Sequence, residues 1–282
     1  MRAAERGIVY PTGEPSGSRS NLTDYLRIVP FKNGDNHGEV EVARPPLFTG
    51  VLPGDYTKIA AAARVKQFTR GEVLHIEGES VQPVLMLTSG FAKISKLGMS
   101  GMEVILRFGV PGDVLGGADL FSTGRHRATA QAFRPSRALV WDALTFKTLV
   151  ERYPVLHQNM ARILGGDLLE LEERFREVAT EKVGQRVARQ LLRLEERIGR
   201  WVDGAIEIGI SREELAQMTG TTLFTVSRLL SAWEALGIVR PRREAVTICD
   251  VPSLRAIGEV TNRWAPKNPS RARKPLYQRL CE

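Results

Sequence analysis

The strongest local signal in the 282-residue chain lies between residues 210 and 239. Ser211 precedes Glu214 by three positions, a spacing at which each side chain can satisfy a free backbone amide at the start of a helix. Gly220 stands where a tight turn between two helices needs a positive φ. Thr222 can then cap a second helix. The pattern predicts two short helices joined by a glycine turn.

One face of the second expected helix is apolar, with Val226, Leu229, Leu230 and Trp233. The opposite face near its start carries Leu223, Phe224, Ser227 and Arg228. A guanidinium presents two N–H donors that match the O6 and N7 acceptors of guanine, so the chemistry available to Arg228 is base recognition. This is the layout of a helix-turn-helix, whose second helix offers its first turns to the major groove. A helical hairpin inside an ordinary α-helical core would show the same small-residue and glycine spacing.

The segments on either side favour the helix-turn-helix. The preceding run VGQRVARQLLRL predicts an amphipathic helix with Arg186, Arg189 and Arg193 on its polar side. The following run GIVRPRREAVTICD predicts two strands around a basic turn that contains Arg242 and Arg243. Helix, helix-turn-helix and hairpin in this order form a winged helix-turn-helix domain.

The part of the chain that precedes these helices has a different texture. After a short expected helix over residues 55–63, strand-length runs alternate with glycine turns. The runs are VLHI, VLMLTSG, FAKISKL, EVILRFG and ALVWDA. Many short strands with turns at short intervals are typical of a β-sandwich or a β-roll. GGADLF adds a strand-to-helix turn built on two glycines, which suits a ligand pocket.

From residue 145 onwards helical periodicity replaces the strands. Apolar residues recur with steps of four and three at Leu164, Leu168, Leu171, Phe175 and Val178. This heptad seam predicts a long helix that pairs with a copy of itself or packs on its own domain, and we favour a homodimer.

We therefore predict an α+β protein with an N-terminal β-sandwich or β-roll, a long helix and a C-terminal winged helix-turn-helix. The family resemblance described below implies that the first domain is a β-roll (jelly roll) sensor domain and that the long helix is a dimerisation helix. The expected boundaries are a flexible extension over 1–45, the sensor domain over 46–150, the dimerisation helix over 151–181, the winged helix-turn-helix over 182–260 and a basic tail over 261–282.

The charge distribution agrees with a nucleic-acid partner. The net charge is +8, and residues 182–282 hold 18 Lys and Arg against 11 Asp and Glu, so the basic excess lies in the C-terminal third. No apolar run is long enough to cross a bilayer, and the N-terminus lacks the apolar core of a signal peptide, so we expect a cytoplasmic protein with no membrane partner. Two cysteines, Cys249 and Cys281, cannot by themselves hold an iron–sulfur cluster.

Residues 46–260 resemble the Crp/Fnr superfamily of bacterial regulators. The stretch PLFTGVLPGDYTKIAAAARVKQFTRGEVLHIEGE resembles the entry to its cyclic-nucleotide-binding-type β-roll, and LTSGFAKI and FGVPGDVLGGADLF continue the match. VSRLLSAWEALGIV is similar to its recognition helix. The resemblance implies a homodimer that binds a palindromic operator in double-stranded DNA, acts with RNA polymerase and responds to a small-molecule or gas effector.

The resemblance also assigns expected DNA contacts. Arg228 is the residue expected to contact guanine; the alternatives for it are a phosphate contact or a salt bridge to Glu234 or other nearby acids. Phe224 stands where many members have a glutamate that accepts from cytosine. Phenylalanine cannot accept, but it can pack on a thymine methyl group. The remaining expected contacts, mostly with phosphates, are Ser211, Thr221, Thr222, Leu223, Thr225, Ser227, Arg242 and Arg243.

The expected effector pocket consists of Gly116, Gly117, Arg127, Ala128 and Thr129. Members that bind cyclic AMP carry a glutamate for the ribose and an Arg-Ser pair for the phosphate. The alignment places Gly117 at the glutamate and Ala128 at the serine, so only Arg127 remains of the three polar anchors. Each lost charge-assisted hydrogen bond is worth about 1.5–3 kcal/mol, which argues against cyclic AMP. Arg127 could serve another ligand, or it could be a plain surface arginine.

Other cofactors have weaker support. An iron–sulfur sensor of this family needs cysteines near the N-terminus, and none precedes Cys249. A haem sensor needs an axial ligand, for which His75, His126 or His157 would serve; His37 lies in the extension. We expect no metal site built from protein side chains, and the effector stays open.

The main hypothesis is thus a sequence-specific DNA-binding transcription regulator. The alternative is an effector-binding regulatory subunit, with a cyclic-nucleotide-like or haem-based sensor, whose main output is not DNA binding. No phosphate loop, zinc-ligand pair or Ser-His-Asp elbow is present in the sequence, so we expect no enzyme and no catalytic residues.

Overall fold

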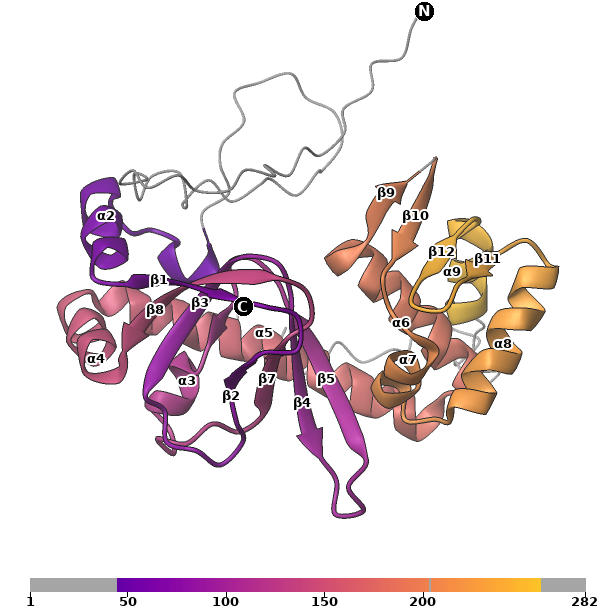
Figure 1. Ribbon diagram of the computed structural model, residues 1–282, viewed down its shortest axis with the longest axis horizontal. Coiled ribbons are helices and arrows are strands. Elements are labelled where there is room, and N and C mark those ends of the chain that lie inside the picture. The colour runs from indigo at the N-terminus through magenta and orange to yellow at the C-terminus, as the bar shows by residue number, and fades with distance from the viewer. Residues whose placement is uncertain (1–44, 203, 260–282) are drawn as a thin grey trace, which may run out of the picture.

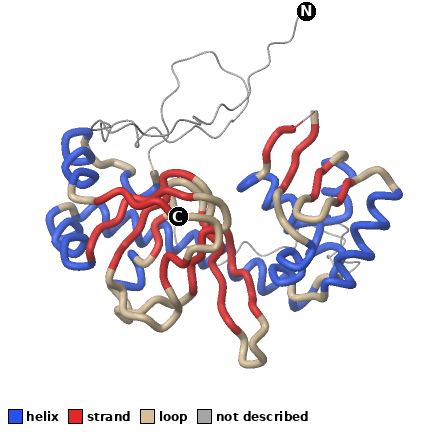
Figure 2. The backbone as a smooth tube through the Cα atoms, viewed as in Figure 1, coloured by secondary structure: helices blue, strands red, loops and turns tan. Residues whose placement is uncertain are grey.

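The computed structural model describes residues 45–202 and 204–259 (Figure 1). The expected N-terminal extension, apart from residue 45, and the expected C-terminal tail lie outside the described residues, as do His37 and Cys281. The described chain has two lobes, one rich in strands and one rich in helices, and the long helix α5 (Pro154–Thr180) runs from one to the other (Figure 2). No helix in the described ranges is long and apolar enough to span a membrane.

The N-terminal lobe contains two four-stranded antiparallel sheets. The first has the order β1 (Arg64–Phe68), β8 (Ser136–Asp142), β3 (Pro83–Ser89) and β6 (Val114–Leu115). The second has the order β2 (Val73–His75), β7 (Thr129–Ala132), β4 (Ala92–Leu97) and β5 (Glu103–Gly109). The five runs identified in the sequence are β2, β3, β4, β5 and β8. The strands β1, β6 and β7 were not expected, because β1 is mostly exposed and the other two are very short or alanine-rich.

Successive side chains in the strands β3 and β8 of the first sheet point to opposite faces, and each face packs into a separate apolar core. In β3, Leu85 and Leu87 face the interior between the sheets, whereas Val84 and Met86 face the helices. The same division holds in β8, where Trp141 points to the helices and its indole N–H donates to the carbonyl of Ile59 at 2.8 Å. A sheet that is buried on both faces is held between its partner sheet and a helical layer.

The helical layer comprises η1 (Pro46–Phe48), α2 (Pro53–Ala61), α4 (Ala143–Arg152) and the first turns of α5. The helix expected over residues 55–63 begins and ends two residues earlier, because Pro53 occupies a first-turn position that needs no amide hydrogen. Asn159 on α5 is buried, and its amide donates to the carbonyls of Leu47 and Thr49 at 2.8 and 2.7 Å. The start of the long helix is therefore fixed to the β-roll.

The C-terminal lobe is a winged helix domain. It contains α6 (Val183–Ile198), α7 (Arg212–Thr219), α8 (Leu223–Ala235), α9 (Val251–Glu259) and a sheet of the order β11 (Val239–Pro241), β12 (Val246–Ile248), β10 (Ala205–Ile208) and β9 (Arg200–Val202). Its core is continuous with Ile105 and Phe108 of β5, so the two lobes share an apolar contact. The hairpin of β9 and β10 was not expected, although Asp203 followed by Gly204 is a sequence signal for a tight turn.

Candidate nucleic-acid interface and sensor cavity

The helix-turn-helix forms as the sequence predicted. Ser211 caps α7: its hydroxyl accepts from the backbone amide of Glu214 at 3.2 Å, and its own amide donates to the Glu214 carboxylate at 2.8 Å. Gly220 ends the helix with φ +60°, a conformation that side chains with a Cβ rarely adopt. Because its polar atoms are engaged in this capping box, Ser211 first of all fixes the start of α7.

The start of α8 presents a mixed face to solvent. Thr222 caps the helix by accepting from the amide of Thr225 at 3.2 Å, and the two hydroxyls lie 3.0 Å apart. Phe224 is 84% exposed and Leu223 is 44% exposed, while Arg228 lies one further turn along on the exposed surface. Within the described ranges no hydrogen bond or ion pair engages Arg228, including the one to Glu234 that the sequence left open. As far as the described residues go, its guanidinium is available to an external acceptor.

The remaining expected contacts of this surface surround α8. Thr221, Thr225 and Ser227 are half-buried, and the Thr221 amide closes the turn on the carbonyl of Ala216. In the wing, β11 and β12 pair antiparallel as expected. Arg242 lies 3.6 Å from the Glu207 carboxylate, and Arg243 is exposed.

The long helix carries an apolar stripe that the described chain leaves uncovered. The exposed fractions are 55% for Leu168, 54% for Leu171, 74% for Phe175, 53% for Val178 and 38% for Leu164. The helix is continuous from Pro154 to Thr180, and the glycine pair at 165 and 166 does not interrupt it. Burial of such a stripe requires a partner outside the described fold.

A cavity of about 610 Å³ lies between the β-roll and α5. Its walls include Gly116, Arg127 and Ala128 from the expected effector pocket, together with three leucines of the stripe, Leu164, Leu168 and Leu171. The turn before α3 (Gly117–Leu120) is the strand-to-helix turn that GGADLF predicted, and Gly116 there has φ +81°.

Two residues of the expected pocket do not line this cavity. A Cβ on Gly117 would lie 3.0 Å from the Val114 side chain and 3.4 Å from the Met160 sulfur, so a larger residue at that position would require these side chains to shift. Thr129 uses its hydroxyl to accept from the amide of Glu77 at 3.1 Å. The site therefore consists of Gly116, Arg127 and Ala128 with residues that sequence reasoning did not single out.

The histidines considered as haem ligands lie in two places. The rings of His75 and His126 stack in parallel at 3.9 Å, and both Nδ1 atoms are buried without a hydrogen-bond partner in the described chain. Burial lowers the pKa of His75 to about 4, assisted by the neighbouring His126, and burial also lowers the pKa of His126. His75 lines the cavity, whereas His157 does not, and its ring centroid lies 6.0 Å from that of Phe121. Among the described residues, no three His, Cys, Asp or Glu side chains are arranged to hold a metal ion.

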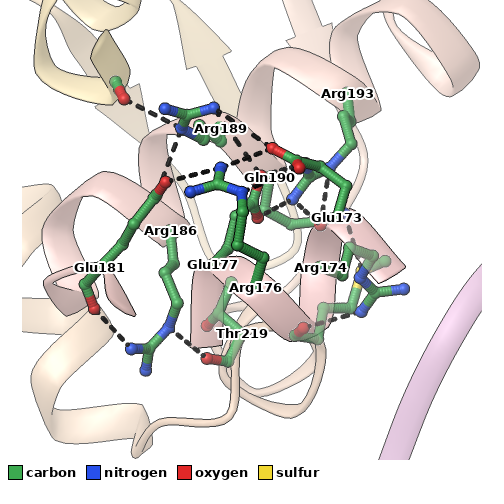
Figure 3. A network of polar contacts seen from close by, with 12 residues as sticks. Glu173, Arg174, Arg176, Glu177, Glu181, Arg186, Arg189, Gln190, Arg193 and Thr219 are labelled. Carbon is green, nitrogen blue, oxygen red and sulfur yellow. Dashed lines mark hydrogen bonds and ion pairs between the residues drawn. The ribbon is translucent and has the colours of Figure 1, made fainter. Parts of the chain in front are cut away.

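A polar network joins the end of α5 to α6 (Figure 3). Glu177 is almost fully buried and accepts two hydrogen bonds from Arg193, both at 2.7 Å. Glu181 lies 3.0 Å from Arg176 and 3.3 Å from Arg189. The polar side of α6 expected from the sequence is thus an interface with α5, because Arg189 and Arg193 meet carboxylates of α5 and of Glu181 at its C-terminal end.

Arg174 links this network to the cavity. It lines the cavity, and its guanidinium donates to the carbonyls of Leu106 in β5 and Met218 in α7, the latter at 2.9 Å. The neighbouring Arg186 donates to the carbonyl of Thr219 at 3.2 Å. Sequence reasoning missed Arg174 because a charged residue on the polar side of a heptad helix carries no signal of burial.

Comparisons with known proteins agree with this architecture. A cyclic nucleotide-binding domain model matches residues 65–153, and a Crp-like helix-turn-helix domain model matches residues 185–257. The CRP-like cAMP-activated global transcriptional regulator of Mycobacterium tuberculosis is 27% identical over 211 residues, which cover 74% of this chain and 94% of that protein. The cyclic AMP receptor protein of Thermus thermophilus is 27% identical over 195 residues, covering 69% and 88%.

Among solved structures, FixK2 from Bradyrhizobium japonicum shares the fold with a TM-score of 0.62 at 23% identity, covering 71% of this chain and 99% of that one. The two matched domains follow one another in the same order as the β-roll and the winged helix domain described above. This chain belongs to the Crp/Fnr family of transcription regulators, with a DNA-binding helix-turn-helix behind a cyclic-nucleotide-binding-type domain.

Proposed function

We propose that the protein is a homodimeric regulator whose α8 helices bind the two halves of an inverted repeat under the control of a small-molecule effector. The observation that carries the proposal is the exposed Arg228 near the start of a capped helix, where no residue of 45–202 or 204–259 forms a hydrogen bond or ion pair with it. A guanidinium held there can donate two hydrogen bonds to guanine in the major groove. Sequence recognition is the chemistry this face supports best.

The dimer follows from the stripe on α5. A row of apolar side chains from Leu164 to Val178 repeats with steps of four and three, which is the spacing of a two-helix seam. Two chains related by a two-fold axis would present their α8 helices about one DNA turn apart, so the operator should have half-sites about 10 base pairs apart.

Phe224 and the wing would have different roles in DNA binding: Phe224 would affect base preference, and the wing would add affinity. The exposed phenyl ring has no polar atom, so it should favour a thymine methyl group over a cytosine amino group. Arg242 and Arg243 would neutralise phosphates and add affinity for every sequence alike. The half-buried Thr221, Thr225 and Ser227 would fix the position of the helix on the backbone.

Binding of the effector in the cavity would provide the regulatory signal. It touches the stripe on one side and, through Arg174, the carbonyl of Met218 in α7 on the other. A ligand that changes the position of α5 would therefore act on both the dimer seam and the helix-turn-helix. Transcriptional output would then require contact with RNA polymerase.

A selection on random DNA duplexes tests the proposal. Wild-type protein should recover a palindromic motif. Arg228→Ala should relax the preference at one position of each half-site and cost about 1–3 kcal/mol per contact. Phe224→Glu should shift the preferred base at its own position towards a pair that offers a cytosine amino group.

Arg255→Ala serves as the matched control, because Arg255 is an exposed arginine of the same domain on α9, away from α8 in the sequence. Its motif should equal that of the wild type. A non-palindromic motif, or an unchanged motif for Arg228→Ala, would contradict the proposed recognition. The alternative of a regulatory subunit without DNA output predicts that no motif is recovered.

A further inference from the structure

The charged side chains that line the cavity have intramolecular partners. Arg107 lies 2.6 Å from Asp113 and 3.8 Å from Asp167, and Lys96 lies 2.7 Å from Glu77. On the acidic side, Glu170 lies 3.0 Å from Arg197. Three of the four lining cations pair with carboxylates, namely Lys96, Arg107 and Arg127, whereas Arg174 donates to backbone carbonyls. These ion pairs offset most of the positive charge with which the wall could hold an anion.

Arg127 is the decisive case. Its Nε donates to one carboxylate oxygen of Asp119 at 2.5 Å, and its backbone amide donates to the other oxygen at 3.2 Å. Asp119 is 9% exposed and belongs to α3, so its carboxylate is held in place by the fold. It sets a fixed negative charge against the Nε side of the guanidinium, while the Arg127 side chain is 60% exposed. A phosphate or sulfonate that approached Arg127 would be repelled by this carboxylate, which offsets the positive charge of the guanidinium.

Arg174 offers no substitute for Arg127. Its two terminal nitrogens donate to the carbonyls of Leu106 and Met218, and one of them also reaches the carbonyl of Ile105. These bonds connect β5 to α7. An anion that drew Arg174 into the cavity would break the contact between the β-roll and the helix-turn-helix.

The rest of the wall is apolar. It consists of Ile94, Leu106, Val114, Leu115, Ala118, Ala128, Met160, Ile163, Leu164, Leu168 and Leu171. A volume of about 610 Å³ is within the range of pockets that hold small organic ligands. Since most of the lining charges are paired within the protein, a ligand gains affinity here chiefly by burying apolar area.

We propose that the cavity binds an uncharged, largely apolar small molecule, and that Asp119 contributes to this specificity by neutralising the charge of Arg127. The inference deepens the proposed sensor function by naming the chemical class of its effector. The ligand lies against the same leucines that form the exposed stripe, so an apolar effector would be packed beside the dimer seam.

Two fluorescent probes of nearly equal shape test the ligand class. N-phenyl-1-naphthylamine is uncharged, and 1-anilinonaphthalene-8-sulfonate is the same aromatic skeleton with a sulfonate. Wild-type protein should bind the uncharged probe at one site per chain and at least about fivefold more tightly than the sulfonate. Equal or tighter binding of the sulfonate at this site would overturn the proposal.

The role of Asp119 is tested by releasing Arg127. Asp119→Ala should tighten sulfonate binding by at least about fivefold and leave the affinity for the uncharged probe almost unchanged, because only the anion uses the released guanidinium. Adding Arg127→Ala to that variant should abolish the gain. A gain that persists in the double variant, or no gain at all, would contradict the assigned role. Calorimetry with cyclic AMP should give a Kd above about 10 μM for the wild type.

The location of the site is tested by filling the cavity. Ala128→Trp and Ala118→Trp place an indole inside the wall and should weaken binding of the uncharged probe at least about tenfold. Ala61→Trp on the exposed end of α2 is the matched control and should bind as the wild type does. Circular dichroism identifies any variant that fails to fold. If one of the two filling variants does not fold, probe binding by the other one tests the location of the site. Unchanged probe binding by a folded filling variant would place the probe elsewhere.

Operator binding, measured on the same samples, separates the two proposals. Probe binding as expected with no operator binding would contradict the proposed function and leave the ligand class standing. Operator binding with no uncharged-probe binding would contradict the ligand class alone.

Discussion

The junction between α5 and α6 and the outer face of α8 both carry side chains that could bind a partner. At the junction these side chains are satisfied within the fold, whereas on α8 they are exposed to solvent. At the junction, Arg193 holds Glu177 through two hydrogen bonds of 2.7 Å, and Glu177 is buried. On α8, Arg228 and Phe224 point to solvent, and within the described ranges no hydrogen bond or ion pair satisfies Arg228. Charged side chains that are paired within the fold stabilise it. Exposed side chains that have no partner among the described residues are available to bind DNA.

The apolar stripe on α5, like the outer face of α8, is exposed in the single chain and is proposed to bind a partner. Leu168→Asp combined with Leu171→Asp would bury charges in the proposed dimer seam, which is strongly unfavourable when a charge has no partner. We expect a complete change from dimer to monomer at micromolar concentration in sedimentation. The free energy of unfolding per chain should change little, because both leucines are more than half exposed in the single chain.

The next largest effect is expected on the free energy of unfolding when the junction between α5 and α6 is altered. Arg193→Met leaves the buried Glu177 carboxylate without its main partner and should lower the free energy of unfolding by about 3 kcal/mol. Urea denaturation followed by circular dichroism measures the loss. Adding Glu177→Met should restore most of the stability, since both charges are then removed. Arg228→Ala should change stability by less than about 0.5 kcal/mol, and a larger loss would remove the contrast between the two regions.

The stacked histidines His75 and His126 are a third class, because both Nδ1 atoms are buried and neither has a hydrogen-bond partner among the described residues. An imidazole has a pKa near 6.5 in the unfolded chain, and burial lowers the pKa of His75 to about 4. Between pH 6.5 and pH 4 the unfolded state binds a proton that the folded state does not. The free energy of unfolding should therefore fall as pH is lowered through this window, by at most about 1.4 kcal/mol per pH unit from this residue.

Denaturation curves at pH 7.5, 6, 5 and 4 would measure this slope. His75→Phe keeps a flat ring in the stack and should give a shallower dependence, while His157→Phe, on the exposed side of α5, should leave it as in the wild type. Equal slopes for His75→Phe and the wild type would mean that another group titrates.

The smallest expected effect distinguishes two neighbouring arginines of the wing. Arg243 has no hydrogen-bond or ion-pair partner among the described residues, whereas Arg242 lies 3.6 Å from Glu207. Each lost phosphate contact should reduce the slope of log K against log salt by about 0.9. Arg243→Ala should therefore change the slope more than Arg242→Ala does, and the reverse order would show that the ion pair opens on DNA.

Much of the fold follows from local sequence. The capping box of Ser211 and Glu214, the positive φ of Gly220 and the alternation in β3 and β8 depend on near neighbours and on fixed periods of two or 3.6 residues. The strands β1, β6 and β7 escaped prediction for the same reason, since an exposed, a very short and an alanine-rich strand carry no clear alternation.

The sequence by itself therefore determined the order of the domains, the helix-turn-helix with Arg228 on its outer face, and the apolar stripe of α5. Only the tertiary structure decided which charged groups are satisfied. Asp119 captures Arg127, Arg193 holds Glu177, and Arg174 connects the cavity to Met218. The physical reason is that a residue type fixes the charge, whereas the distance to its partner and the local burial, which decide whether that charge is available, arise only when distant segments pack together.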